Sequence, residues 1–447
     1  MKKIKRVHFV GIGGIGMSAL AQWYLHEGWH VSGTDEADSP IIRMLRKKGA
    51  RIFVGKHTAK NVPKHTGRVV YSQAVIVTGV HINPEIHEAK KRGIVLHSYP
   101  QALGELTKEK YTIAVCGTHG KSTTTGLAGV LLANAGLDPT VIVGATVPEF
   151  KNSNFRYGDS KYLVIEADEY KGSFLEYRPD VVVWTTVEWE HIDYFKTFKE
   201  TLSHFRRFLL NISKKGYIIA NRDDANIRRV VSSLLSNKKH IYYYSFLRGE
   251  KDKIQKKMKL IGTHNVSNAL GIYELGRVLG IPSHVFYKTL QGFSGVGRRL
   301  EYKGKLNGVL MYDDYGHHPT EIKTTLHGVR EKYAQRLRRG KLWCVYQPHQ
   351  YQRTKYLFSD FARAFMDADG VVLLDIYSVA GREKASLKKQ VSSEKLADAI
   401  IKNKTPAFYI PAQKDAAWFI RKTAQKNDIV VVMGAGDIWK IWRYLKS

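Results

Sequence analysis

Ile113–Gly126 reads IAVCGTHGKSTTTG, and this stretch determines how the middle of the chain folds. The apolar run Tyr111–Cys116 predicts a buried strand, and Thr123–Asn134 has the pattern of a helix. Gly117–Gly120 forms a short glycine-bracketed loop between them. Backbone N–H groups of such a loop, together with the positive end of the following helix, attract phosphate groups. The stretch therefore predicts a nucleotide-phosphate site.

Lys121 and Ser122 follow this loop at the start of the predicted helix. A lysine in this position reaches the terminal phosphates of a nucleotide, and the serine hydroxyl can ligate magnesium. Val115 stands where the long form of the motif has its first glycine. A chance Gly-Lys-Ser sequence in a turn would lack the flanking strand and helix. The residues expected to contact the nucleotide are Gly117, Thr118, His119, Gly120, Lys121, Ser122 and Thr123.

The chain has 447 residues, enough for two to four domains, and a formal net charge of +31. Such a charge suits nucleic acid, an acidic membrane or anionic small substrates. The basic residues are dispersed, however, so a basic solvated surface is favoured over nucleic-acid binding. Cys116 and Cys344 both lie in apolar runs, which fits reduced thiols and a cytoplasmic protein. No apolar run approaches the length of a membrane span.

The sequence GIGGIG at Gly11–Gly16 lies between a predicted strand, Val7–Val10, and a helix that runs to about His26. A second predicted strand, His30–Gly33, leads to Asp35. This order of strand, GxGxxG, helix, strand and acid is of Rossmann type. The loop alone does not distinguish a nicotinamide dinucleotide from another diphosphate. The candidate binding residues are Gly11, Gly13, Gly14, Gly16 and Asp35.

Acids and a histidine follow two further predicted strands. Lys161–Ile165 leads into EADE at 166–169, and Val181–Val187 leads into a segment containing Glu188 and His191. Such groups at the carboxyl ends of parallel strands, beside a phosphate loop, are placed to hold the metal ions of a nucleotide. Either set of acids could equally be solvated loop residues.

A third series of strands and polar clusters begins near Gly295. The predicted strands Leu310–Tyr312 and Leu342–Tyr346 lead into DDYGHHPTE and QPHQYQRT. We therefore predict an α/β protein of three domains. These are a Rossmann-like N-terminal domain (1–107), a central P-loop-type mononucleotide-binding domain (108–294) and a C-terminal Rossmann-like domain (295–447).

Motifs along the whole chain resemble those of the Mur ligase family. They are GIGGIGMSALA, GTHGKSTTTG, EADEYKGSFL, EHIDYF, GTHNVSNAL, GRRLEY, DDYGHHPTEI, QPHQYQRT and GAGDI, in this order. The resemblance implies that the first domain holds a UDP-sugar, the second ATP, and the third the amino acid and part of ATP. GIGGIGMS and DDYGHHPTE point to ATP-dependent ligation of L-alanine to the lactyl carboxylate of UDP-N-acetylmuramate through an acyl phosphate.

The resemblance also implies roles for single residues. Gly11–Gly16 looks like the UDP-diphosphate loop, and Lys121 and Ser122 look like the ATP-phosphate and magnesium groups. Further implied roles are metal ligation by Glu169 and His191, nucleotide contacts by Asn265 and Asp314, a phosphate contact by Arg299, and positioning of substrate and alanine by Tyr315, His317 and Arg353. His317 is a candidate general base, and a structural or substrate-holding role suits it at least as well.

The chain departs from the family pattern at several positions. Thr186 and Glu190 stand where the family often has Asn and Asp, and Gln350 stands where many members have arginine. The connection Leu247–Ile261 is short and basic, so part of the central sheet is expected to be missing.

Two other functions remain open from the residues. A recycling ligase would attach a ready-made peptide to the same UDP-sugar. A basic NTPase stimulated by nucleic acid would have no use for the GIGGIG loop.

Overall fold

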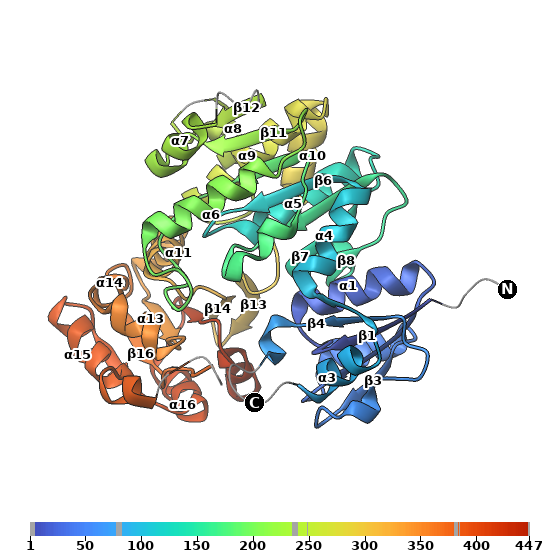
Figure 1. Ribbon diagram of the computed structural model, residues 1–447. Helices are drawn as coiled ribbons and strands as arrows, with labels where there is room; N and C mark the ends of the chain where they lie inside the picture. The colour runs from blue at the N-terminus through green and yellow to red at the C-terminus, as the bar shows by residue number, and fades with distance from the viewer. Residues whose placement is uncertain are drawn as a thin grey trace. The chain divides into compact units, whose positions relative to one another are not determined.

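The computed structural model describes residues 5–76, 83–234, 240–247, 249–379, 383 and 385–445. It contains three sheets of mostly parallel strands with connecting helices, which confirms the predicted three-part α/β fold (Figure 1). By its internal contacts the chain separates into two compact units. The first unit consists of Met1–Glu188, Phe198–Ile254 and Asn268–Phe293, and the second of Trp189–Thr197, Gln255–Ser267 and Ser294–Ser447. The boundaries at 107/108 and 294/295 stay predictions.

The first sheet is entirely parallel, with the order β3-β2-β1-β4-β5. Its strands are β1 (Arg6–Val10), β2 (His30–Asp35), β3 (Arg51–Val54), β4 (Arg68–Tyr71) and β5 (Val95–Ser98). The helices that accompany it are α1 (Ile15–His26), α2 (Pro40–Lys47), α3 (Pro84–Lys91) and α4 (Tyr99–Glu109). Ser39 caps α2 through its side chain, as the Ser-Pro pair in the sequence suggests.

The second sheet has seven strands in the order β12-β11-β10-β6-β9-β7-β8. They are β6 (Tyr111–Cys116), β7 (Thr140–Val147), β8 (Ser153–Arg156), β9 (Tyr162–Glu166), β10 (Val181–Trp184), β11 (Tyr217–Asn221) and β12 (His240–Tyr244). Its helices are α5 (Lys121–Asn134), α6 (Phe198–Leu210), α7 (Ala225–Ser232), α8 (Lys251–Lys257), α9 (Thr263–Val278) and α10 (Ser283–Gly292). Helix α1 packs against both β2 and β7, so it lies between the first two sheets (Figure 1).

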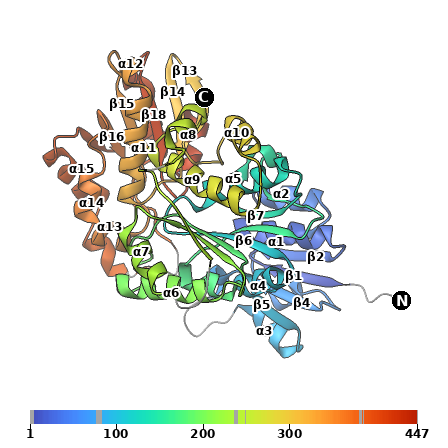
Figure 2. The ribbon, with the colours of Figure 1, turned by 90° about the horizontal axis from the view of Figure 1, so that it is seen from above.

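The third sheet has the order β13-β14-β18-β15-β16-β17, with β13 and β14 forming an antiparallel hairpin (Figure 2). Its strands are β13 (Glu301–Leu306), β14 (Val309–Asp314), β15 (Leu342–Tyr346), β16 (Gly370–Leu373), β17 (Ala407–Tyr409) and β18 (Ile429–Met433). Its helices are α11 (Pro319–Lys332), α12 (Ala334–Leu337), α13 (Tyr351–Tyr356), α14 (Phe358–Arg363), α15 (Ser393–Lys402), α16 (Gln413–Thr423) and α17 (Trp442–Leu445). Alternate residues of β18 enter the two cores on opposite faces, because successive side chains of a strand point in opposite directions.

Two predicted strands have the predicted bounds, Tyr111–Cys116 and Leu342–Tyr346. The strand predicted to reach Val187 was too long: β10 ends at Trp184, and the N–H of Val187 donates to the side chain of Asp224. In the connection after β12, the described residues form α8 and no strand. Among the described residues, no helix combines the length and apolar character needed to cross a lipid bilayer.

The first sheet is fastened by a buried carboxylate, Glu85, in the first turn of α3. One of its oxygens lies 2.9 Å from His8 Nε2 and accepts from the Thr34 hydroxyl at 2.8 Å. The other lies 2.8 Å from His57 Nδ1 and accepts from the Asn61 amide at 3.2 Å. Burial alone would raise the pKa of Glu85, but the hydrogen bonds from His57 and His8 hold it at about 2.

Glu85→Gln should therefore destabilise the chain at neutral pH. The folded-state pKa lies below the ordinary value of 4.5, so the stabilisation is fully present above pH 4.5 and is lost as the pH falls toward 2. We expect a loss of about 3 kcal/mol at pH 7, measured by urea unfolding. The control is Glu88→Gln, which removes only the 4.0 Å contact with Arg92 on the same helix. Equal unfolding midpoints of the two variants at pH 7 would contradict this role.

Candidate active site

The GIGGIG loop connects β1 to α1 and is held by the end of β2. Gly11 has a φ of +80°, a left-handed conformation that favours glycine. The N–H groups of Gly11 and Ile12 both donate to the Thr34 carbonyl at 2.9 Å. The N–H of Gly13 donates to Asp35 Oδ2 at 2.8 Å, and a Cβ on Gly13 would lie 2.8 Å from the same oxygen. The predicted loop and Asp35 thus lie together.

The other two glycines shape the start of α1. Gly14 is the N-cap residue and brings no side chain to the positive end of the helix. Gly16 lies against Tyr99, the first residue of α4, since a Cβ on Gly16 would be 2.7 Å from the tyrosine ring. Gly16 therefore allows α1 and α4 to pack closely, which fixes the helix end that follows the loop.

The phosphate loop of the second sheet is equally crowded. Gly117 and Gly120 have φ angles of +134° and +81°. A Cβ on Gly117 would lie 2.2 Å from the Thr185 hydroxyl, and one on Gly120 would lie 2.6 Å from the Asn268 amide oxygen. Thr123, the third residue of α5, is buried. Glycines are therefore required at both ends of this loop.

Lys121 begins α5, and its ammonium group is deeply engaged. It donates to the carbonyls of Gly117 and Thr118 at 2.6 and 3.2 Å, and to Glu169 Oε2 at 2.9 Å. Burial would lower the pKa of Lys121, but the charges of Glu169 and Asp168 more than compensate and raise it. The Lys121 ammonium is thus a cation held against the backbone of the phosphate loop.

Ser122 donates its hydroxyl hydrogen to Glu166 Oε1 at 3.1 Å. The second oxygen of Glu166 accepts from the N–H of Gly144 at 2.8 Å. The sequence analysis did not name Glu166 as a site residue, although it is the first acid of the EADE motif. Its position at the end of β9, next to β6 in the sheet, was the available signal.

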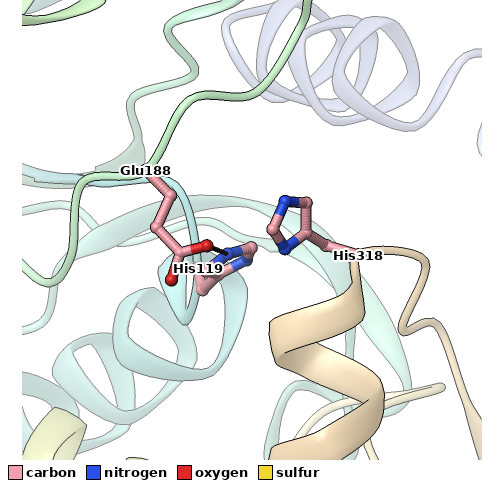
Figure 3. A group of neighbouring side chains, drawn as sticks. All are labelled: His119, Glu188 and His318. Carbon is pink, nitrogen blue, oxygen red and sulfur yellow. Dashed lines mark ion pairs between the residues drawn. The ribbon is translucent and has the colours of Figure 1, made fainter. Parts of the chain in front are cut away.

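His119 and Thr118 connect the phosphate loop to the segment after β10. The N–H of His119 donates to the Thr186 hydroxyl at 3.0 Å, and its ring lies 3.5 Å from the Glu188 carboxylate (Figure 3). The N–H of Glu188 donates to the Thr118 hydroxyl at 2.8 Å. Thr186, a departure from the family pattern, therefore supports the loop backbone.

The predicted metal ligands fall in both units: Ser122 and Glu169 belong to the first, and His191 to the second. In the first unit, hard oxygen donors gather at the start of α5: the Ser122 hydroxyl, the carboxylate of Glu166 bonded to it, and that of Glu169 bonded to Lys121. Magnesium prefers such donors, so the residues present fit this ion.

Strained backbone in the second unit lies at one predicted site residue, His191, and close to others. His191 and Gln350 have φ angles of +53° and +73°. Arg298 and Leu300, at +57° and +48°, flank Arg299. Non-glycine residues in this region cost about 1–3 kcal/mol each and concentrate at functional sites.

Arg299 and Asp314 organise the start of the third sheet. Arg299 pairs with Glu321 at 3.2 Å and lies over the Tyr315 ring at 5.2 Å. Asp314 is buried and accepts the N–H groups of Leu300 and Gly316 at 2.7 and 2.6 Å. Burial, partly offset by Arg299, raises the pKa of Asp314 to about 6. Both residues therefore shape the loops around them.

Asn265, predicted as a nucleotide contact, lies in the first turn of α9. Its side-chain amide donates to the Ile261 carbonyl at 2.8 Å, so it fastens the segment that precedes this helix.

His317 and Arg353 converge on a carboxylate that the sequence analysis noted only as a departure. Glu190 Oε1 lies 3.0 Å from His317 Nε2 and 3.0 Å from Arg353 Nη2. His317 Nδ1 lies 3.2 Å from the Tyr315 carbonyl, which only accepts hydrogen bonds. Burial would raise the pKa of Glu190, but His317 and Arg353 hold it well below its usual range.

Both ring nitrogens of His317 therefore lie within hydrogen-bonding distance of an oxygen acceptor. The three roles that the sequence left open for His317, as a base, as a structural residue or in holding substrate, stay predictions.

A small cavity of about 10 Å³ lies beside this cluster within the second unit. Its lining includes Glu190, His191, Asp193, Gln350 and Arg353. The wall of the cavity combines apolar residues with both signs of charge.

Three family models match the chain in the order that the sheets occur. They are "Mur ligase family, catalytic domain" over residues 6–111, "Mur ligase middle domain" over 115–274 and "Mur ligase, glutamate ligase domain" over 298–436. The chain belongs to the Mur ligase family.

Individual relatives match over nearly their whole length. The UDP-N-acetylmuramate–L-alanine ligase of Clostridium perfringens is 35% identical, with 98% of this chain and 96% of the relative covered. The protein of the same name from Aquifex aeolicus is 37% identical with the same coverage.

The fold is shared with solved structures. The UDP-N-acetylmuramate-alanine ligase from Thermotoga maritima has a TM-score of 0.80 at 23% identity, covering 99% of this chain and 98% of that one. A murein peptide ligase from Psychrobacter arcticus has a TM-score of 0.72, with the same identity and coverage. These likenesses concern the fold alone.

Gly16→Ala should destabilise the chain because its methyl group would overlap the Tyr99 ring. We expect a loss of about 1–3 kcal/mol, measured by urea unfolding. Gly14→Ala is the matched control in the same loop: its Cβ would meet nothing closer than 3.5 Å, at a φ of −60°. A Gly14→Ala change as costly as Gly16→Ala would show that packing against Tyr99 is not what requires glycine.

Lys121→Ala should reduce kcat for ATP turnover by at least about tenfold, or about 1.4 kcal/mol of barrier, because it removes the cation fixed at the phosphate loop. Lys110→Ala is the control, since Lys110 Nζ bonds only the Ser160 carbonyl among its described contacts. Circular dichroism would verify that both variants are folded. A folded Lys121→Ala protein that keeps more than a tenth of kcat would disprove the role.

Proposed function

We propose that the chain is an ATP-dependent ligase that joins L-alanine to the lactyl carboxylate of UDP-N-acetylmuramate. The products are UDP-N-acetylmuramoyl-L-alanine, ADP and phosphate, and the step serves peptidoglycan precursor synthesis in the cytoplasm. The observation that carries the proposal is the identity of 35–37%, over 98% of the chain, to relatives named for this activity. The fixed lysine of the phosphate loop supports an ATP-dependent reaction.

The chemistry requires activation of the sugar's carboxylate. A carboxylate is a poor acyl donor, so the γ-phosphoryl group of ATP is first transferred to it, and the alanine amine then displaces phosphate from the acyl phosphate. Such transfer depends on positioning and on cations around the phosphoryl group. The Lys121 ammonium donates hydrogen bonds to the carbonyls of Gly117 and Thr118 and to the Glu169 carboxylate. Binding of the phosphates then replaces at least one of these bonds.

The remaining residues have proposed roles that follow their surroundings. Ser122, Glu169 and His191 are the proposed magnesium ligands, and the ion would neutralise charge on the transferred phosphoryl group. Arg299 supplies a further cation, while Asn265 in the first turn of α9 and Asp314 at the end of β14 are the proposed nucleotide contacts. Because His317 is already engaged by Glu190, we assign it to substrate holding, and the amine proton leaves through another group or solvent.

The recycling ligase is the second candidate from the same family. Its support is a shared fold with the murein peptide ligase, which does not discriminate between ligases of one family. The relatives at 35–37% identity favour the alanine reaction.

Phosphate release should require ATP, UDP-N-acetylmuramate and L-alanine together, with a magnesium salt present. We expect at least tenfold slower release when alanine is omitted or replaced by L-alanyl-D-glutamyl-diaminopimelate. Faster release with the tripeptide would establish the recycling reaction instead. Release stimulated by DNA or RNA, with no need for the UDP-sugar, would reject both ligases.

A further inference from the structure

Glu190 combines a buried carboxylate with two cationic partners from distant parts of the chain. Its residue is 5% exposed, and a single oxygen, Oε1, lies 3.0 Å from both His317 Nε2 and Arg353 Nη2. The partners follow β14 and β15 in the third sheet, whereas Glu190 lies in the separate segment Trp189–Thr197. One atom therefore fixes two side chains relative to each other.

Arg353 lines the cavity beside this cluster and is the only arginine among the lining residues described for it. Gln350, where many family members have an arginine, lines the same cavity and brings no charge. Recognition of a ligand carboxylate that approaches this wall would therefore depend on the guanidinium of Arg353.

The orientation of Arg353 depends on two contacts. Nη2 donates to Glu190, and Nη1 lies 3.2 Å from His349 Nδ1 and 3.3 Å from the His349 carbonyl. His349 lies one turn before Arg353 and offers only neutral acceptor atoms in these contacts. Glu190 is thus the charged group that holds the arginine, and charge-assisted bonds are roughly twice as strong as neutral ones.

We propose that Glu190 is a positioning residue that holds Arg353 and His317 in place for the carboxylate of the incoming amino acid. The inference rests on the proposed ligase function. Glu190 itself need not touch the substrate. Without the charge of Glu190, the guanidinium loses its charged partner and Arg353 can leave the cavity wall. The amino acid would then bind more weakly, while ATP and the UDP-sugar bind as before.

Glu190→Gln keeps the shape of the side chain and removes its charge. We expect the KM for L-alanine to rise at least tenfold, with the KM values for ATP and UDP-N-acetylmuramate changing less than twofold. Glu190→Asp keeps the charge but is one methylene shorter, so it cannot keep both 3.0 Å contacts and should give an intermediate KM for alanine. It also carries the test if Glu190→Gln does not fold.

Asp369→Asn is the matched control, because Asp369 pairs with Arg330 at 2.7 Å in the same unit and is absent from the cavity lining. Its KM for alanine should equal that of the wild type. A double-mutant cycle adds a second measure: Glu190→Gln and Arg353→Gln together should raise the KM for alanine by less than the product of the two single effects.

The outcomes distinguish a failure of the proposed ligase function from a failure of the positioning role of Glu190. If the wild-type protein releases phosphate without regard to L-alanine, the proposed function fails. If the wild type requires alanine but Glu190→Gln leaves its KM unchanged, or raises all three KM values together, the positioning role is rejected and Glu190 is only structural. Additive effects in the cycle would also reject it.

Discussion

The ion pair between Lys121 and Glu169 is the interaction on which the candidate active site depends. A buried ammonium group is strongly disfavoured unless a carboxylate and further acceptors surround it. Glu169 supplies the charge, and the carbonyls of Gly117 and Thr118 supply the acceptors. The loop must therefore curl around its own lysine, and only glycines fit at the two positions where it approaches Thr185 and Asn268.

The burial of the parallel strands explains why the functional groups gather at strand ends. The strands of all three sheets are mostly parallel and buried, so their side chains are apolar, as Val181–Trp184 and Ile429–Met433 illustrate. The predicted site residues that follow these strands lie at the carboxyl ends, which parallel strands present along one edge. Glu166 after β9 and the loop after β6 meet in this way, because the two strands are neighbours.

Local patterns made most of the fold predictable from sequence. The glycine loops, the apolar strands and the Ser-Pro helix start are each encoded within a few residues, and the structure contains them all. The partners of buried charges were not predictable, because they lie far away in sequence: Glu190 and Arg353 are separated by 163 positions, and Glu85 and His8 by 77. No periodicity reveals which acid will be buried beside which base. The end of β10 was missed for a similar reason, since the side chain of Asp224 takes the N–H of Val187.

Buried charges also indicate which parts of the fold have a functional role rather than a purely structural one. Replacing a buried ion pair by apolar residues is often neutral or stabilising, so such pairs are weak evidence for stability alone. Glu85 makes four hydrogen bonds that join strands of the first sheet to helix α3. This structural role is enough to explain its buried charge. Glu190 differs, since it holds an arginine and a histidine beside a cavity. The next residue, His191, has a strained backbone. Strained backbone and buried charge persist only where the surrounding structure enforces them. A reaction between anionic substrates gives a reason for fixing side chains such as Arg353 in one geometry before those substrates arrive.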